Sequence, residues 1–140
     1  MKNKLLIVLV FLIPLIAACE KEEVKDLVPP EANVSLPTNN TTYYRGNTLM
    51  FTGSFTDDVA LKECTFYLSP GLKATRGWDD PWQPNAQTFP LSGKSDELIE
   101  QHLFELTIPN DIMSGNYVLK VLAVDQALNY STTEIPIEIK

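Results

Sequence analysis

The sequence predicts an all-β fold, an antiparallel β-sandwich of about seven strands in residues 33–140. Three observations predict it. Apolar and polar residues alternate with a period of two in several segments, turn-forming residues separate these segments, and no long stretch has the periodicity of an amphipathic helix. A chain of 140 residues is long enough for one hydrophobic core but not for two.

The first 18 residues have the layout of a secretion signal. Residues 1–4 carry Lys2 and Lys4, and residues 5–18 form an apolar run that only Pro14 interrupts. A helix that spans a bilayer needs about 20 apolar residues, so this run is too short to cross. We therefore expect residues 1–18 to be a signal peptide that takes no part in the fold.

Cys19 follows this segment in a context that resembles the bacterial lipobox. The motif is Ile16-Ala17-Ala18-Cys19, and the resemblance implies that the thiol is acylated and that the peptide is cut before it. Two or more acyl chains anchor a protein stably, whereas one does not. The alternative is a plain signal peptide that happens to contain a cysteine. We predict lipidation at Cys19 and attachment to a membrane.

Residues 19–32 are predicted to form a tether, because they are charged, contain Pro29-Pro30 and show no sustained apolar period. A short amphipathic helix over residues 20–28 is the alternative, and it would end before Pro29. The run Glu20-Lys21-Glu22-Glu23 resembles the charged export signal of Bacteroidetes-type lipoproteins. This resemblance implies a place on the outer membrane facing the cell exterior, with a periplasm-facing location as the alternative.

Five segments have the alternation of half-buried strands: residues 48–56, 62–68, 102–108, 116–125 and 133–140. Their predicted inward residues are Leu49, Phe51, Phe55, Cys64, Phe66, Leu68, Phe104, Leu106, Ile108, Tyr117, Leu119, Val121, Ala123, Ile135, Ile137 and Ile139.

Two further local features are predicted within this part of the chain. Residues 96–103 allow at most one helical turn. Pro136 indicates that the last strand lies at a sheet edge, because proline cannot donate a hydrogen bond to a neighbouring strand.

Two motifs resemble bacterial immunoglobulin-like and cadherin-like repeats: FTDDVALKECTFYL at residues 55–68 and IPNDIMSGNYVLKVLAVDQALNYS at residues 108–131. The chain is most similar to a Bacteroidetes lipoprotein family of unknown function with one such domain. The resemblance covers residues 33–140 and implies an immunoglobulin-like sandwich with a surface role, but no activity. Leu128 departs from the pattern, since such repeats usually carry glycine there.

Charge and reactive residues exclude several functions. Loss of Lys2 and Lys4 with the signal leaves 9 of 11 basic side chains against 18 acidic ones, so no nucleic-acid partner is expected. Cys64 alternates with Phe66 and Leu68, which predicts a small buried hydrophobe. His102 is the only histidine and is predicted to be a core or strand-edge residue. We therefore expect no enzyme.

Calcium is a candidate ligand, although no resident cofactor is required by the sequence. In an immunoglobulin-like topology the loop with Asp57 and Asp58 and the loop with Asp125 and Asn129 lie at the same end of the sandwich, which would gather four oxygen-bearing side chains. The alternative, which we favour, is that each aspartate caps its own turn through nearby backbone amides.

Residues 69–95 are too long and too rich in Pro, Gly and Asp for an ordinary hairpin loop. They contain both tryptophans, Trp78 and Trp82. With Arg76 and Asp79 beside them, exposed indoles could stack on a sugar or anchor a protein. The alternative is that both rings fold back over the sandwich as a satellite core.

These features predict a surface-exposed lipoprotein whose domain binds or adheres without enzymatic activity, with a glycan or a protein as its ligand. A structural accessory subunit of an outer-membrane or cell-envelope complex is the alternative. A hydrolase is a weaker alternative, for lack of catalytic residues.

Overall fold

The computed structural model describes residues 24–74, 80–104 and 107–140, which form eight β-strands and no helix. The strands are β1 Glu31–Leu36, β2 Thr41–Tyr43, β3 Met50–Thr56, β4 Leu61–Ala74, β5 Gln87–Pro90, β6 Ser95–His102, β7 Gly115–Asp125 and β8 Tyr130–Ile139. Within these ranges no helix is long and apolar enough to cross a membrane. The predicted signal peptide and the lipobox at Cys19 lie outside the described residues.

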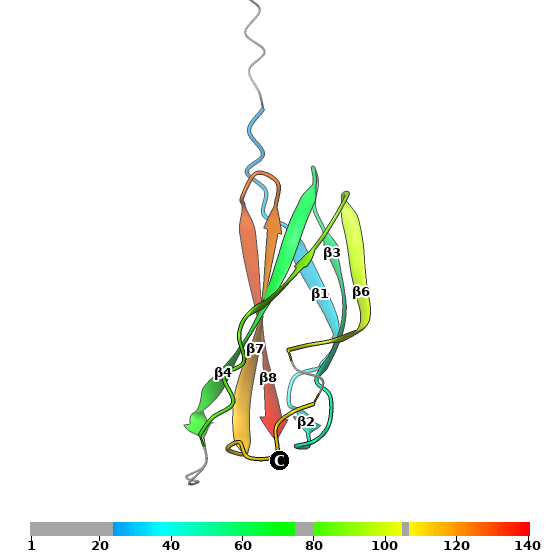
Figure 1. Ribbon diagram of the computed structural model, residues 1–140. Coiled ribbons are helices and arrows are strands. Elements are labelled where there is room, and N and C mark those ends of the chain that lie inside the picture. The colour runs from blue at the N-terminus through cyan, green and yellow to red at the C-terminus, as the bar shows by residue number, and fades with distance from the viewer. Residues whose placement is uncertain (1–23, 75–79, 105–106) are drawn as a thin grey trace, which may run out of the picture.

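The strands form two facing sheets, as the all-β sandwich prediction requires (Figure 1). The smaller sheet has the order β1-β3-β6, and the larger has the order β2-β8-β7-β4-β5. All pairs are antiparallel except β2 with β8, which is parallel. The fold class predicted from alternation is therefore confirmed, with eight strands in place of about seven.

The core lies between the inner faces of the two sheets. Phe51 of β3 packs edge-on against Phe66 of β4 across this space, with ring centroids 4.7 Å apart. Burying an aromatic or large aliphatic side chain of this kind contributes roughly 1.5–3 kcal/mol. The predicted inward residues that are buried are Leu49, Phe51, Phe55, Cys64, Phe66, Leu68, Ile108, Tyr117, Leu119, Val121, Ala123, Ile135, Ile137 and Ile139.

One predicted strand is wrong. The segment that pairs with β3 is Ser95–His102, so the strand ends where residues 102–108 were expected to begin one. Phe104 has a φ of 61°, which lies outside the β region and breaks the extended backbone there. Leu103 and Ile108 are buried, so these residues still enter the core, but as a connection. Leu106 lies outside the described residues.

Residues 96–103, for which the sequence allows at most one helical turn, form no helix, since they belong to β6 and its end. Leu98 packs against the core while Ile99 is exposed, which is the alternation of an edge strand with one buried face. His102 is the last residue of this edge strand and is exposed, in agreement with the strand-edge expectation.

Pro136 is not in an edge strand, because β2 pairs with β8 beyond it. That pairing covers only Ile137–Ile139 of β8, and at Pro136 a single contact remains, in which the Asn40 amide donates to the Pro136 carbonyl at 2.7 Å. The carbonyl and nitrogen of one strand residue point the same way. The missing N–H of Pro136 therefore faces the thinly covered β2 side.

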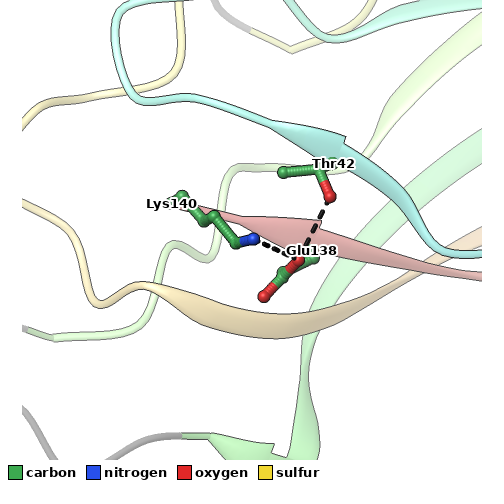
Figure 2. Close-up of polar contacts among 3 residues, drawn as sticks. All are labelled: Thr42, Glu138 and Lys140. Atoms are coloured by element: carbon green, nitrogen blue, oxygen red, sulfur yellow. Dashed lines mark hydrogen bonds and ion pairs between the residues drawn. The ribbon is translucent and has the colours of Figure 1, made fainter.

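The parallel β2–β8 pair closes the end of the sandwich opposite the tether (Figure 1). Thr42 donates to the Glu138 carboxylate at 3.1 Å, and Lys140 pairs with the same carboxylate at 3.2 Å (Figure 2). The ion pair is largely exposed, so it adds little stability by itself. Its position fixes β2 beside the last residues of β8.

Candidate functional site

The tether joins the domain at the end where two predicted aspartate loops meet (Figure 1). The Asn129 side-chain amide donates to the Asp26 carbonyl at 3.2 Å, Pro30 is buried, and β1 begins at Glu31. The described part of the tether therefore contacts the domain, whose first strand begins at Glu31.

Asp57 and Asp125 each cap their own turn, which was the favoured alternative. Asp57 Oδ2 accepts the amides of Val59 at 2.9 Å and Ala60 at 2.7 Å. Asp125 is completely buried, and its two oxygens accept the backbone amide of Asn129 at 2.8 Å and its side-chain amide at 2.7 Å. These bonds satisfy a carboxylate that burial would otherwise destabilise.

A cluster of three carboxylates also lies at this end. Asp26, Asp57 and Asp58 each place a carboxylate oxygen within 4.8 Å of the others. The second oxygen of Asp57, Oδ1, is buried and has no hydrogen-bond partner. Asp57 and Asp58 also line a depression, together with Val28, Pro29, Glu31 and Thr56.

The cluster fits the expected calcium site only in part. Carboxylate oxygens are suitable ligands, but calcium takes about six to eight oxygens. The carbonyls of Asp26 and Asp58 already accept bonds from Asn129 and from Lys94 Nζ. The structure thus brings together two of the four predicted ligands, adds Asp26, and ties Asp125 and Asn129 to each other. Calcium stays a prediction at this position.

Trp82 lies in the satellite core that the sequence offered as the alternative to a binding loop. Its side chain is 5% exposed and packs edge-on against Phe104, with ring centroids 5.9 Å apart. Its backbone amide donates to the Tyr117 hydroxyl at 3.1 Å, which in turn donates to the Met113 carbonyl at 2.5 Å. A ring held in this way does not offer its face to a ligand. Arg76, Trp78 and Asp79 lie outside the described residues.

Sequence reasoning missed the outer face of the five-stranded sheet. The register places Tyr67 beside Lys120, and Lys120 beside Glu134, on three neighbouring strands. Tyr67 is 41% exposed, and a shallow depression of about 400 Å³ lies among Tyr67, Ser69, Lys120 and Leu122. We call this depression and the flanking Val124 and Tyr130 the outer-sheet patch.

The patch is apolar for a face that contains no core residue. Leu122 and Val124 point outward from β7 and are only partly covered, and Tyr130 at the start of β8 is 67% exposed. Lys120 and Glu134 form an exposed ion pair at 3.0 Å. A signal was present in the sequence: residues 117–124 are apolar at nearly every position, so both faces of this strand carry apolar side chains.

The cysteine and the buried threonine of the described region have structural roles. Cys64 is a free, fully buried cysteine, as predicted, and burial raises the pKa of its thiol to about 12. A thiol is nucleophilic as the thiolate, so this one is inert at neutral pH. Thr65 and Thr88 bond to each other at 2.8 Å across β4 and β5, which joins the edge strand to the sheet.

A comparison with protein families gives a match for this chain. No curated protein matches this chain. A family model described as a domain of unknown function, DUF4625, matches residues 17–140, which includes every described residue. Because the match spans most of the chain and continues through the whole two-sheet sandwich, the chain belongs to the DUF4625 family.

Proposed function

We propose that this chain is a lipid-anchored, non-enzymatic binding protein that uses the outer-sheet patch to hold a protein partner at the cell envelope. The observation that carries the proposal is that Tyr67 and Tyr130 are exposed on one sheet face, with the half-buried Leu122 and Val124 beside them. Exposed aromatic and aliphatic side chains with few charges are typical of protein interfaces.

A protein partner is favoured over a glycan by the side chains that remain exposed. The glycan hypothesis depended on two indoles, and the ring of Trp82 is buried. The outer-sheet patch offers tyrosines and aliphatic groups with one ion pair, Lys120–Glu134. Tyrosine and aliphatic anchors in a shallow depression suit a protein surface, while sugar binding needs more hydroxyl-bonding groups around each ring.

The anchor and the location in this proposal come from the lipobox resemblance at Cys19 and from the acidic residues after it. Acylation would hold the domain at the outer membrane, facing the cell exterior. Protease treatment of intact cells tests the location: loss of the domain supports exposure, and survival until the outer membrane is opened supports the periplasm-facing alternative.

Photo-crosslinking tests the partner. A benzophenone amino acid replaces Tyr67 in the full-length protein in its own cells, and the matched control replaces Tyr44, which is 56% exposed beside β2 at the far end of the sandwich. The expected result is a discrete protein adduct from position 67 and none from position 44. Equal labelling, or no adduct at either position, contradicts the proposal.

A second measurement separates the glycan alternative. In this measurement the protein is applied to immobilised polysaccharide. If the parent is retained, Tyr67→Ala and Tyr130→Ala are not, and no protein is crosslinked, then the ligand is a glycan and not a protein. Both variants change exposed side chains and are expected to keep stability within about 0.5–1 kcal/mol of the parent.

A further inference from the structure

Four exposed apolar side chains surround the point where the tether joins the domain. Leu27 and Val28 are 70% and 52% exposed in the tether, Val59 is 52% exposed in the β3–β4 turn, and Leu128 is 64% exposed in the β7–β8 turn. Both turns lie at the end of the sandwich where the chain enters (Figure 1). We call these four residues the apolar collar.

The collar is held together by polar contacts beneath it. Asn129 binds the Asp26 carbonyl and the Asp125 carboxylate at once, which joins the tether to the β7–β8 turn. Val28 lines the same depression as Asp57 and Asp58 of the β3–β4 turn. The four apolar residues therefore belong to one surface and not to a loose linker.

The length of chain between Cys19 and the collar limits how far the collar can lie from the membrane. Asp26 follows Cys19 by seven positions, and a fully extended chain covers at most about 3.6 Å per residue, or about 25 Å in total. A tether that ran free to residue 32 would reach almost twice as far. Because the contact at Asp26 shortens it, the collar end is the part of the domain nearest to an anchor at Cys19.

The charges at this end carry both signs. The carboxylates of Asp26, Asp57 and Asp58 lie together, and Lys94 reaches the Asp58 carbonyl at 2.6 Å while Lys25 is exposed in the tether. A zwitterionic headgroup presents an ammonium and a phosphate. Carboxylates outnumber the lysines at this end, because Glu31 lines the same depression as Asp57 and Asp58. An anionic surface would repel these carboxylates, whereas a zwitterionic headgroup offers them an ammonium group.

We propose that the apolar collar rests on the zwitterionic headgroup region of the lipid surface. This contact holds the domain upright on the membrane. The inference depends on the proposed anchor at Cys19. Exposed aliphatic groups insert at the headgroup boundary, and the attached acyl chains keep them at high local concentration there. The outer-sheet patch, which runs along the side of the sandwich, then remains open to its partner.

The test uses the full lipidated protein reconstituted in phosphatidylcholine vesicles. An environment-sensitive fluorophore is attached at Leu128→Cys, and the matched control carries it at Tyr44→Cys at the opposite end. Cys64 is buried and does not take the label in the folded protein. Flotation reports the anchor, and quenching by nitroxide lipids against quenching by aqueous iodide reports contact with the bilayer.

The expected result is flotation of both proteins, with at least twofold stronger nitroxide quenching and weaker iodide quenching at position 128 than at position 44. A Leu27→Asp/Val59→Asp double variant should abolish that difference while still floating. Flotation with equal quenching at both positions overturns the docking proposal and leaves the anchor standing. Failure to float overturns the anchor and the docking inference with it, whereas crosslinking at Tyr67 tests the partner separately.

Discussion

Asn129 and Asp26 are 103 positions apart in the sequence, yet the side-chain amide of Asn129 donates to the backbone carbonyl of Asp26 at 3.2 Å. The same amide group binds Asp125 Oδ2 at 2.7 Å. One side chain thus satisfies a buried carboxylate and attaches the tether to the last β-hairpin.

Replacing Asn129 with Ala is expected to release the tether and destabilise the domain. The fully buried carboxylate of Asp125 would lose its hydrogen bond from the Asn129 side chain, which costs about 2–3 kcal/mol. Urea unfolding measures this loss, and proteolysis or hydrogen exchange of residues 24–30 measures the release. Asp26→Ala is the control, because it keeps the carbonyl acceptor. A tether as protected in Asn129→Ala as in the parent would contradict the link.

Leu128→Gly is expected to stabilise the domain. Leu128 has a φ of 68°, so the β7–β8 turn has the left-handed backbone conformation that favours glycine. A side chain in that conformation costs roughly 1–2 kcal/mol, and the greater freedom of glycine in the unfolded chain offsets part of the gain. The net change should be an increase of up to about 1 kcal/mol in the free energy of unfolding.

Ala127→Gly serves as the control for this turn, since Ala127 is exposed and does not have a positive φ. It should lower the free energy of unfolding by about 0.5–1 kcal/mol. Equal effects of the two substitutions would show that the backbone conformation at Leu128 carries no strain.

Trp82→Ala is expected to cost about 3–5 kcal/mol in urea unfolding, because it removes a buried indole and its contact with Phe104. Tyr130→Ala, which changes an exposed ring of the outer-sheet patch, should cost less than about 1 kcal/mol. Unchanged stability in Trp82→Ala would mean that the indole is not part of the core.

The buried thiol of Cys64 is expected to make the free energy of unfolding depend on pH in the alkaline range. Burial raises the pKa of its thiol from the ordinary value of 9.0 to about 12 in the folded protein. Above pH 9 the unfolded chain loses this proton and the folded chain keeps it, so stability that is complete below pH 9 is lost as the pH rises towards 12. The slope is at most about 1.4 kcal/mol per pH unit.

Comparing the parent with Cys64→Ala isolates this contribution, because the other alkaline groups titrate in both proteins. Chemical denaturation is measured from about pH 8 to about pH 11, a range that extends to both sides of the pKa in the unfolded chain. The free energies of unfolding of the parent and of Cys64→Ala should converge as the pH rises. Parallel curves would contradict the raised pKa.

Asp58→Asn tests the carboxylate cluster and the calcium prediction together. In EDTA the substitution should raise the free energy of unfolding by a few tenths of a kcal/mol, since it removes repulsion among Asp26, Asp57 and Asp58. Calcium should stabilise the parent more than the variant if the cluster binds it. Asp111→Asn, an exposed aspartate elsewhere, is the control. Identical calcium responses of all three proteins would exclude the cluster as a calcium site.

Local alternation in the sequence was enough to predict the strands that form the centre of the sandwich. Phe51 and Phe55 in β3, and Leu119 and Val121 in β7, are buried as their period of two requires. The failure at residues 102–108 has a local cause that alternation does not contain, the positive φ of Phe104.

The candidate sites were less predictable, because their residues come from distant strands. Tyr67, Lys120 and Glu134 are neighbours only through the register of three strands. Asp26 joins Asp57 and Asp58 only because the tether folds onto the domain. Neither relationship has a signature within a short segment of sequence.

The sequence by itself determined the period-two pattern, and with it the all-β class, most of the core and the turn-capping aspartates, because these depend on neighbouring residues. Only the tertiary structure decided that Trp82 is core, that an apolar patch remains on the outer sheet and that the tether is attached at Asp26. Those outcomes depend on the free energy of packing segments far apart in the chain, where burial and hydrogen bonding must exceed the entropy lost in bringing them together.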